Sequence, residues 1–270
     1  MGKGTIIGLV IGFGALILGF ILEHGNVLSL FLLSPAVIVI GGTIGALLIS
    51  FSVADVAKIP KLLGEAMSEP KTSLQTTMDL VLELASKVKR EGMLVLEQVT
   101  QDENFKAKSD PLLVRGLTLL MDGLDKSVLQ EIFDNDMHIF EQLKKQDIAV
   151  FEAAGGFSPT LGIIGTVLGL IQVLANMGTP EELAKSIAVA FIATLYGVLF
   201  ANLIYLPIAA KLKLRLKLQS QEKAMIIDGL LAINDLESPI AIRERLVPYL
   251  SFEKRGKAAK AKGDGGEKGE

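Results

Sequence analysis

The sequence predicts an all-α integral membrane protein with four transmembrane helices. They form two hairpins, with a large helical cytoplasmic insertion between spans 2 and 3 and a cytoplasmic C-terminal tail. Hydrophobic residues make up 50% of the 270 residues, and they gather in four stretches that contain no Asp, Glu, Lys or Arg. Each stretch reaches the ~20 residues that a helix needs to cross the hydrocarbon core. Two of the three connections are very short and the third is a long polar block, which gives two hairpins.

The first hairpin occupies residues 1–54, with spans at about 4–22 and 28–53. Only Lys3 and Glu23 are charged within it. A lysine followed by an apolar run also begins a signal peptide, but this run exceeds the usual ~7–15 residues, and no small-residue cleavage site precedes Glu23. We therefore predict a first helix that stays in the mature protein.

The insertion, residues 55–152, is expected to be a helical domain. Apolar residues recur at helical spacing over 74–88, 111–124 and 126–150. The pair Asp110-Pro111 is a helix start signal. The last of these segments is expected to continue into the third span.

The second hairpin occupies residues 153–210, with spans at about 155–176 and 187–210. A helical cytoplasmic tail is expected over 211–250. Residues 251–270 are rich in Lys, Gly and Glu, and such a segment cannot bury a core, so it is expected to be disordered.

The distribution of basic residues predicts the orientation, because Lys and Arg near span ends stay cytoplasmic. One side carries Lys3, Lys58, Lys61, Lys144, Lys145, Lys211, Lys213, Arg215 and Lys217. The short connections carry Lys185 against Glu23, Glu181 and Glu182. Both termini and the insertion are therefore expected to be cytoplasmic, and a bacterial inner membrane is the expected location of this multi-pass chain.

Composition argues against several classes of function. There is no Cys, and the two His, His24 and His138, are far apart, so a disulfide scaffold and a Cys- or His-rich metal site are not expected. The net charge of −3 argues against a nucleic-acid partner. No Gly-rich phosphate loop, Walker-type lysine or GxSxG motif occurs. We therefore expect no enzymatic activity, no cofactor and no resident metal.

The spans contain many small residues and no charged ones, whereas an ion carrier would need charged side chains. Ionisable residues inside a membrane usually mark ion pathways, so this chain cannot supply a protonatable relay by itself. Gly4, Gly8 and Gly12 lie four residues apart, as do Gly165 and Gly169, which lets helix backbones approach closely. The pattern predicts a helix-packing protein that surrounds a partner, and the partner would bring the charged ion carrier.

Three segments together carry a resemblance to a known family. The run FSPTLGIIGTVLGL at 157–170, the run ATLYG with the residues that follow it over 193–209, and KREGMLVLE at 89–97 resemble the signature segments of the MotA family of flagellar stator proteins, which includes the sodium-type PomA and MotP. The order of spans and the large insertion agree with this family over nearly the whole chain.

The resemblance implies partners and a function. Family members form a ring of five copies around a dimer of a single-span MotB-type subunit, which carries the ion-binding aspartate. Translocated sodium or protons drive the ring, and its cytoplasmic domain exerts torque on the rotor through the switch protein FliG. The insertion would then be a rotor-interaction domain.

The resemblance also assigns a rotor-facing segment. Lys89, Arg90 and Glu97 would contact the rotor, with either Lys89 or Arg90 as the basic partner. On one continuous helix Arg90 and Glu97 would share a face, since they are seven residues apart. The spacing alone is more typical of a solvated helix face.

The same resemblance assigns residues within the second hairpin. Pro159 and Pro207 would couple conformational change to ion flow, although proline also simply punctuates helices. Thr166 and Thr194 would line the ion pathway, and threonine at the Thr166 position resembles the sodium type, so a transient sodium ion is weakly favoured over a proton. Without that context, such hydroxyls usually bond to a carbonyl one turn earlier.

Two other interpretations compete with a stator. An ExbB/TolQ-type energiser of a periplasm-reaching partner would share the last two spans, but those proteins have three spans with the loop after the first. A self-contained transporter would show charged or broken-helix sites at the bilayer midplane, which are not visible in the sequence.

Overall fold

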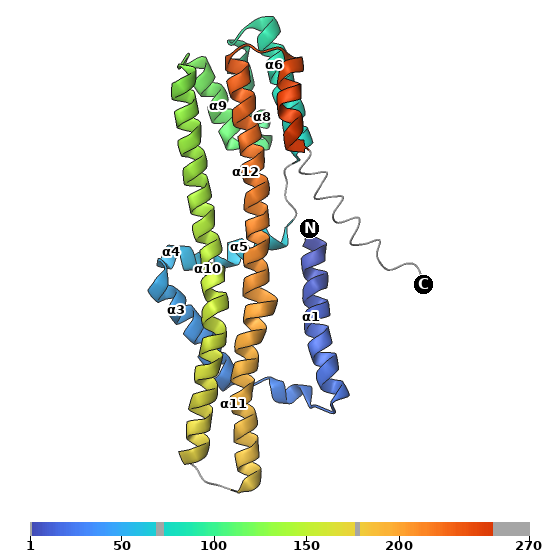
Figure 1. Cartoon of the computed structure of the whole chain (residues 1–270), viewed down its shortest axis with the longest axis vertical. Helices are drawn as coiled ribbons and strands as arrows, with labels where there is room; N and C mark the ends of the chain where they lie inside the picture. Colours follow the sequence, from blue (N-terminus) through green and yellow to red (C-terminus); the bar gives the residue numbers. More distant parts are fainter. Residues whose placement is uncertain (1, 69–72, 176–178, 251–270) are drawn as a thin grey trace, which may run out of the picture. The chain divides into compact units, whose positions relative to one another are not determined.

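The fold is nearly all helical, as the sequence predicts. The computed structural model describes residues 2–68, 73–175 and 179–250; the tail expected to be disordered, 251–270, lies outside them, as does residue 176 at the end of the third span. The helices are α1 (Gly2–Leu22), α2 (Leu33–Ala36), α3 (Gly42–Ser50), α4 (Val53–Ala57), α5 (Ile59–Met67), α6 (Leu74–Glu91), α7 (Val95–Gln101), α8 (Glu103–Lys108), α9 (Pro111–Met121), α10 (Lys126–Ala175), α11 (Pro180–Phe200) and α12 (Leu206–Asn234), with the shorter turns η1 (Val27–Leu30), η2 (Val37–Gly41) and η3 (Ala201–Tyr205) (Figure 1). A further helix covers residues 239–250.

The chain divides into two compact units. The first contains Met1–Pro70 and Leu143–Arg215, and the second contains Lys71–Gln142 and Leu216–Glu270. The long helices α10 and α12 each contribute residues to both units. Among the described residues, the helical stretches that are long and apolar enough to span a membrane are Gly4–Leu22, Val27–Ser50, and parts of Lys126–Ala175 and Glu182–Asn234.

The second unit has a conventional hydrophobic core. It is formed by one face each of α6, α7, α9, α10 and α12, together with helix 239–250. Its most buried large side chains include Met78, Leu117, Phe133, Met225 and Leu230. The Asp110-Pro111 start signal works as predicted, because the Asp110 side chain accepts a hydrogen bond from the Leu112 amide at 2.8 Å.

In the first unit, α10 and α11 form an antiparallel pair (Figure 1). The expected continuation of 126–150 into the third span is confirmed, since α10 runs without a break from Lys126 to Ala175 and includes Pro159. The fourth span passes from α11 through the π-helical turn η3 into α12. This turn lies just before Pro207, whose missing amide and ring are incompatible with regular α-helical bonding to the turn before it.

The second span is not one continuous helix. The turn η1 ends at Leu30, Phe31 and Leu32 leave helical geometry, and the chain resumes as α2 at Leu33. A π-helical turn, η2, then joins α2 to α3. A break within an apolar, membrane-spanning stretch leaves backbone groups that lipid cannot satisfy, so they need partners from the protein.

Candidate functional site in the paired helices α10 and α11

The backbones of α10 and α11 come unusually close at two glycines. A Cβ atom on Gly197 would lie 2.6 Å from the Ser158 carbonyl oxygen and 3.1 Å from the Gly162 Cα. A Cβ atom on Gly162 would lie 2.8 Å from the Ala193 carbonyl oxygen. Because the obstructing atoms belong to the backbone, neither position has room for a side chain.

The predicted packing glycines differ in their surroundings. Cβ atoms on Gly165 and Gly169 would lie 2.7 and 2.6 Å from the Cβ atoms of Ala193 and Ala190, so both glycines face α11. On α1, a Cβ atom on Gly12 would lie 3.0 Å from a methyl of Leu203. For Gly4 and Gly8, the described part of the chain places nothing within 4 Å.

Thr166 and Thr194 meet one turn beyond the glycine contact. Their hydroxyl oxygens are 2.6 Å apart. The Thr166 Oγ1 also lies 3.0 Å from the Ala190 carbonyl oxygen and 3.2 Å from that of Gly162, and the Thr194 Oγ1 lies 3.4 Å from the latter. The structure therefore brings together two residues 28 positions apart that the family resemblance assigns to one pathway.

The four oxygens of this cluster share few protons. The cluster consists of the hydroxyls of Thr166 and Thr194 and the carbonyls of Gly162 and Ala190. Each hydroxyl has one proton, so Thr166 donates to only one of its three neighbours at a time. The four oxygens can therefore form more than one pattern of hydrogen bonds. Oxygen is also the ligand atom that hard cations take.

Pro159 and Pro207 occupy different settings. Pro159 lies within α10, and its Cα would be 3.1 Å from a Cβ on Gly197. The neighbouring Ser158 is fully buried, and its hydroxyl donates to the Gly197 carbonyl at 3.0 Å. Pro207 is exposed near the start of α12. Only Pro159 is thus part of the close contact between α10 and α11.

The segment 89–97, which the resemblance predicts to face the rotor, does not form one helix. α6 ends at Glu91, Gly92 has φ +82°, and α7 begins at Val95. Glycine adopts a positive φ without the steric cost that an L side chain incurs. The expectation that Arg90 and Glu97 share a face of one continuous helix is therefore wrong, although both side chains are exposed.

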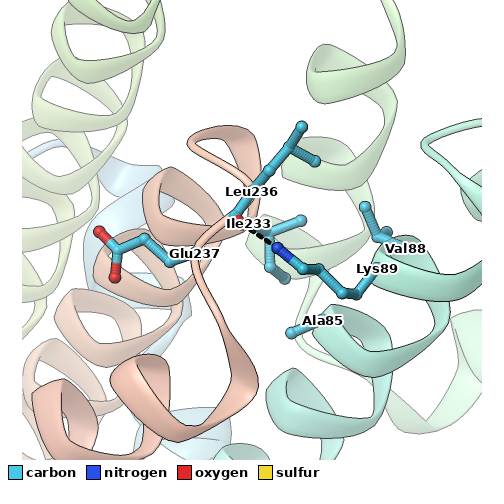
Figure 2. A pocket seen from close by; sticks show the side chains of 6 residues that line it. All are labelled: Ala85, Val88, Lys89, Ile233, Leu236 and Glu237. Atoms are coloured by element: carbon cyan, nitrogen blue, oxygen red, sulfur yellow. Dashed lines mark hydrogen bonds between the residues drawn. The ribbon is translucent and has the colours of Figure 1, made fainter.

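Lys89 and Arg90 have distinct surroundings. The Lys89 ammonium donates to the Leu236 carbonyl at 3.1 Å, beside a small depression lined by Val88, Ile233 and Glu237, among others (Figure 2). Leu236 lies just past the end of α12, where free carbonyls attract cations. The Arg90 side chain is 70% exposed, and it lies 4.0 Å from the carboxylate of the adjacent Glu91.

A charged cluster that sequence reasoning missed ties α4 to α10. The buried Asp55 accepts hydrogen bonds from the Ser52 hydroxyl at 2.6 Å, the Lys58 ammonium at 2.9 Å and the Gln146 amide at 2.8 Å. Lys58 also reaches Asp147 at 3.4 Å. The hydrogen bond from Ser52, followed by that from Lys58, lowers the pKa of Asp55, so this carboxylate stays charged.

Some of these features had a signal in the sequence and others did not. Gly162 and Gly197 lie inside the segments that carry the family resemblance, so the run of glycines around them could have marked the contact. Asp55 and Gln146 are 91 residues apart, and nothing in either segment indicates the other.

Comparison with known proteins places these features in a family. Residues 104–225 match the profile described as the MotA/TolQ/ExbB proton channel family, and residues 6–92 match that of the motility protein A N-terminal region. The motility protein A of Bacillus subtilis is 31% identical over 272 residues, covering 100% of this chain and 99% of the relative. The chemotaxis protein PomA of Vibrio alginolyticus is 32% identical over 256 residues, covering 94% and 98%.

Solved structures agree with these matches. The MotAB structure from C. jejuni aligns with a TM-score of 0.85 and 26% identity, covering 92% of this chain and 96% of that one. The flagellar MotAB stator complex from Bacillus subtilis aligns with a TM-score of 0.84 and 31% identity, covering 94% and 98%. The chain therefore belongs to the motility protein A family, within the larger MotA/TolQ/ExbB proton channel family.

Proposed function

We propose that the chain is a flagellar stator subunit that converts transmembrane ion flow into torque on the rotor. It would form a homo-oligomeric ring, of five copies, around a dimer of a MotB-type single-span partner. The observation that carries this proposal is the full-length match to motility protein A, together with the match to two MotAB complexes. The function is ion-driven mechanical work, with no cofactor.

The composition of the spans supports a division of labour between two subunits. Residues 4–22, 28–53, 155–176 and 187–210 contain no Asp, Glu, Lys or Arg. An ion that crosses the bilayer needs a charged or strongly polar carrier at depth, and the MotB-type partner would supply that carboxylate. Lipid and neighbouring copies would cover the exposed apolar faces of the spans, and the basic residues at their ends support cytoplasmic termini in the inner membrane.

Gene deletion tests the stator function directly. Cells that lack the gene should assemble normal flagella, seen by electron microscopy, yet fail to swim in soft agar. Expression of the intact chain in the same strain should restore swimming. Normal swimming after deletion of every stator gene in the cell would contradict the proposal.

We further propose that sodium is the coupling ion and passes near Thr166 and Thr194. The four convergent oxygens of this cluster support the proposal, because hard cations take oxygen ligands. The resemblance of Thr166 to the sodium-type members of the family points the same way.

Replacement of one hydroxyl tests the coupling ion. Swimming speed should rise with external sodium at constant ionic strength and fall with the sodium-channel blocker phenamil. Thr166→Val keeps the shape but removes the hydroxyl, so the sodium concentration for half-maximal speed should rise about tenfold, as expected for one lost polar ligand. Thr166→Ser keeps the hydroxyl and serves as the control. Speed that ignores sodium but collapses with a protonophore would instead identify protons.

A further inference from the structure

The helix break at the start of the second span creates unsatisfied backbone groups within an apolar segment. The break falls at Phe31 and Leu32, inside the membrane-spanning stretch Val27–Ser50. Leu32 has extended geometry, with φ −118° and ψ 130°, and its apolar side chain cannot cap the helix α2 that follows. In hydrocarbon, each unpaired amide or carbonyl costs several kcal/mol.

The hydroxyl of Tyr196 satisfies one group on each side of this break. It donates a hydrogen bond to the Leu30 carbonyl and accepts one from the Leu32 amide, the latter at 3.0 Å. Tyr196 comes from α11, more than 160 residues further along the chain. A phenol can donate and accept at once, so a single hydroxyl covers both ends of the break.

The Tyr196 ring is itself held in place. It lies at 5.9 Å, centroid to centroid, from the ring of Phe200 one turn along α11, with the planes tilted by 49°. Such tilted aromatic pairs are favourable. The same helix carries Thr194, which bonds to Thr166 on α10. α11 is therefore hydrogen-bonded to α10 through the Thr194 hydroxyl and to the start of the second span through the Tyr196 hydroxyl, two residues further along.

We propose that Tyr196 is a positioning residue of the stator: its hydroxyl ties the broken start of the second span to α11 and keeps that segment in register with the helix pair. The effect on torque rests on the proposed stator function. The hydrogen bonds themselves do not, so the two can fail separately.

Tyr196→Phe removes the hydroxyl and keeps the ring. The matched control is Tyr205→Phe, which removes a hydroxyl from the same span at the edge of a different apolar cluster. In the complex with its MotB-type partner, reconstituted in lipid, amide hydrogen exchange over residues 27–36 should be about tenfold faster in Tyr196→Phe, as expected for the loss of a buried polar partner. The control should exchange like the wild type.

Motility gives the second measurement. Tyr196→Phe should insert, co-purify with the partner at wild-type yield and swim more slowly in viscous medium, whereas Tyr205→Phe should swim normally. Unchanged exchange over 27–36 would overturn the hydroxyl tie. Faster exchange with unchanged speed would overturn its role in torque. A failure of the stator function itself would appear differently, as swimming that survives deletion of the gene.

Discussion

Gly197→Ala is expected to abolish swimming, although it adds a single methyl group. That carbon would lie 2.6 Å from the Ser158 carbonyl oxygen and 3.1 Å from two backbone Cα atoms of α10. No side chain can move aside there, so α10 and α11 would have to separate. Transmembrane helices associate through such close backbone contact, and adding a carbon to a well-packed core typically costs about 1–3 kcal/mol.

Separation of the helices would also disrupt the hydroxyl pair beyond the contact. Thr166 is one turn from Gly162, and Thr194 is one turn from Gly197. Their 2.6 Å hydroxyl contact would lengthen with the helix spacing. Gly197→Ala should thus reduce soft-agar swimming to background, while immunoblots of membrane fractions show the protein still inserted.

A second glycine on α10 provides the control. Gly156→Ala places its Cβ where nothing in the described part of the chain lies within 4 Å, so swimming should stay near the wild-type level. Equal loss of swimming in both variants would show that the motor is sensitive to any added methyl on these helices. Normal swimming of Gly197→Ala would refute the close-contact argument.

The features that could be predicted from the sequence are those that depend on local residue patterns. Charge-free runs of sufficient length locate all four spans, and the Asp110-Pro111 pair marks the start of α9 because its side-chain cap acts within two residues. The meeting of Thr166 with Thr194 followed only from resemblance. The residues around a hydroxyl on one helix do not indicate which hydroxyl on another helix it will contact.

The features that escaped prediction depend on tertiary contacts or on backbone geometry. The break at Leu32 needs the Tyr196 hydroxyl from a distant helix, and the Asp55 cluster needs Gln146. The end of α6 was predictable in principle, because Gly92 is a C-terminal helix signal. One continuous helix over 89–97 is incompatible with this signal.

Charge reversal at Arg90 is expected to reduce swimming strongly, whereas neutralising Lys89 should mainly affect folding stability. Arg90 is 70% exposed with a long, weak contact to Glu91, so its charge is available to a protein partner such as the proposed rotor. Lys89 instead donates to the Leu236 carbonyl at the end of α12. Of the two basic residues that the sequence left as alternatives, the contacts favour Arg90 as the rotor contact.

The expected sizes follow from these two roles. Arg90→Glu places like charge against an acidic partner surface, which costs several kcal/mol in such interfaces, so swimming should fall to about a tenth or less with normal membrane insertion. Lys89→Met loses one hydrogen bond, about 1 kcal/mol, which should lower the melting temperature of the purified protein by a few degrees and leave most of the swimming intact.

Glu97 extends the test to the other side of the glycine break. Arg90 and Glu97 lie on separate helices. If both contact the rotor, we expect them to act as two independent charges, so the losses from Arg90→Glu and Glu97→Lys should add when measured as torque on tethered cells. Lys89→Arg, which keeps both charge and hydrogen-bonding capacity, is the control for position 89. If the double reversal Arg90→Glu/Glu97→Lys swims normally, the rotor contact lies elsewhere. If Lys89→Met stops rotation while Arg90→Glu does not, Lys89 rather than Arg90 is the rotor contact. The loss of one hydrogen bond at a helix end would lower the stability without stopping rotation.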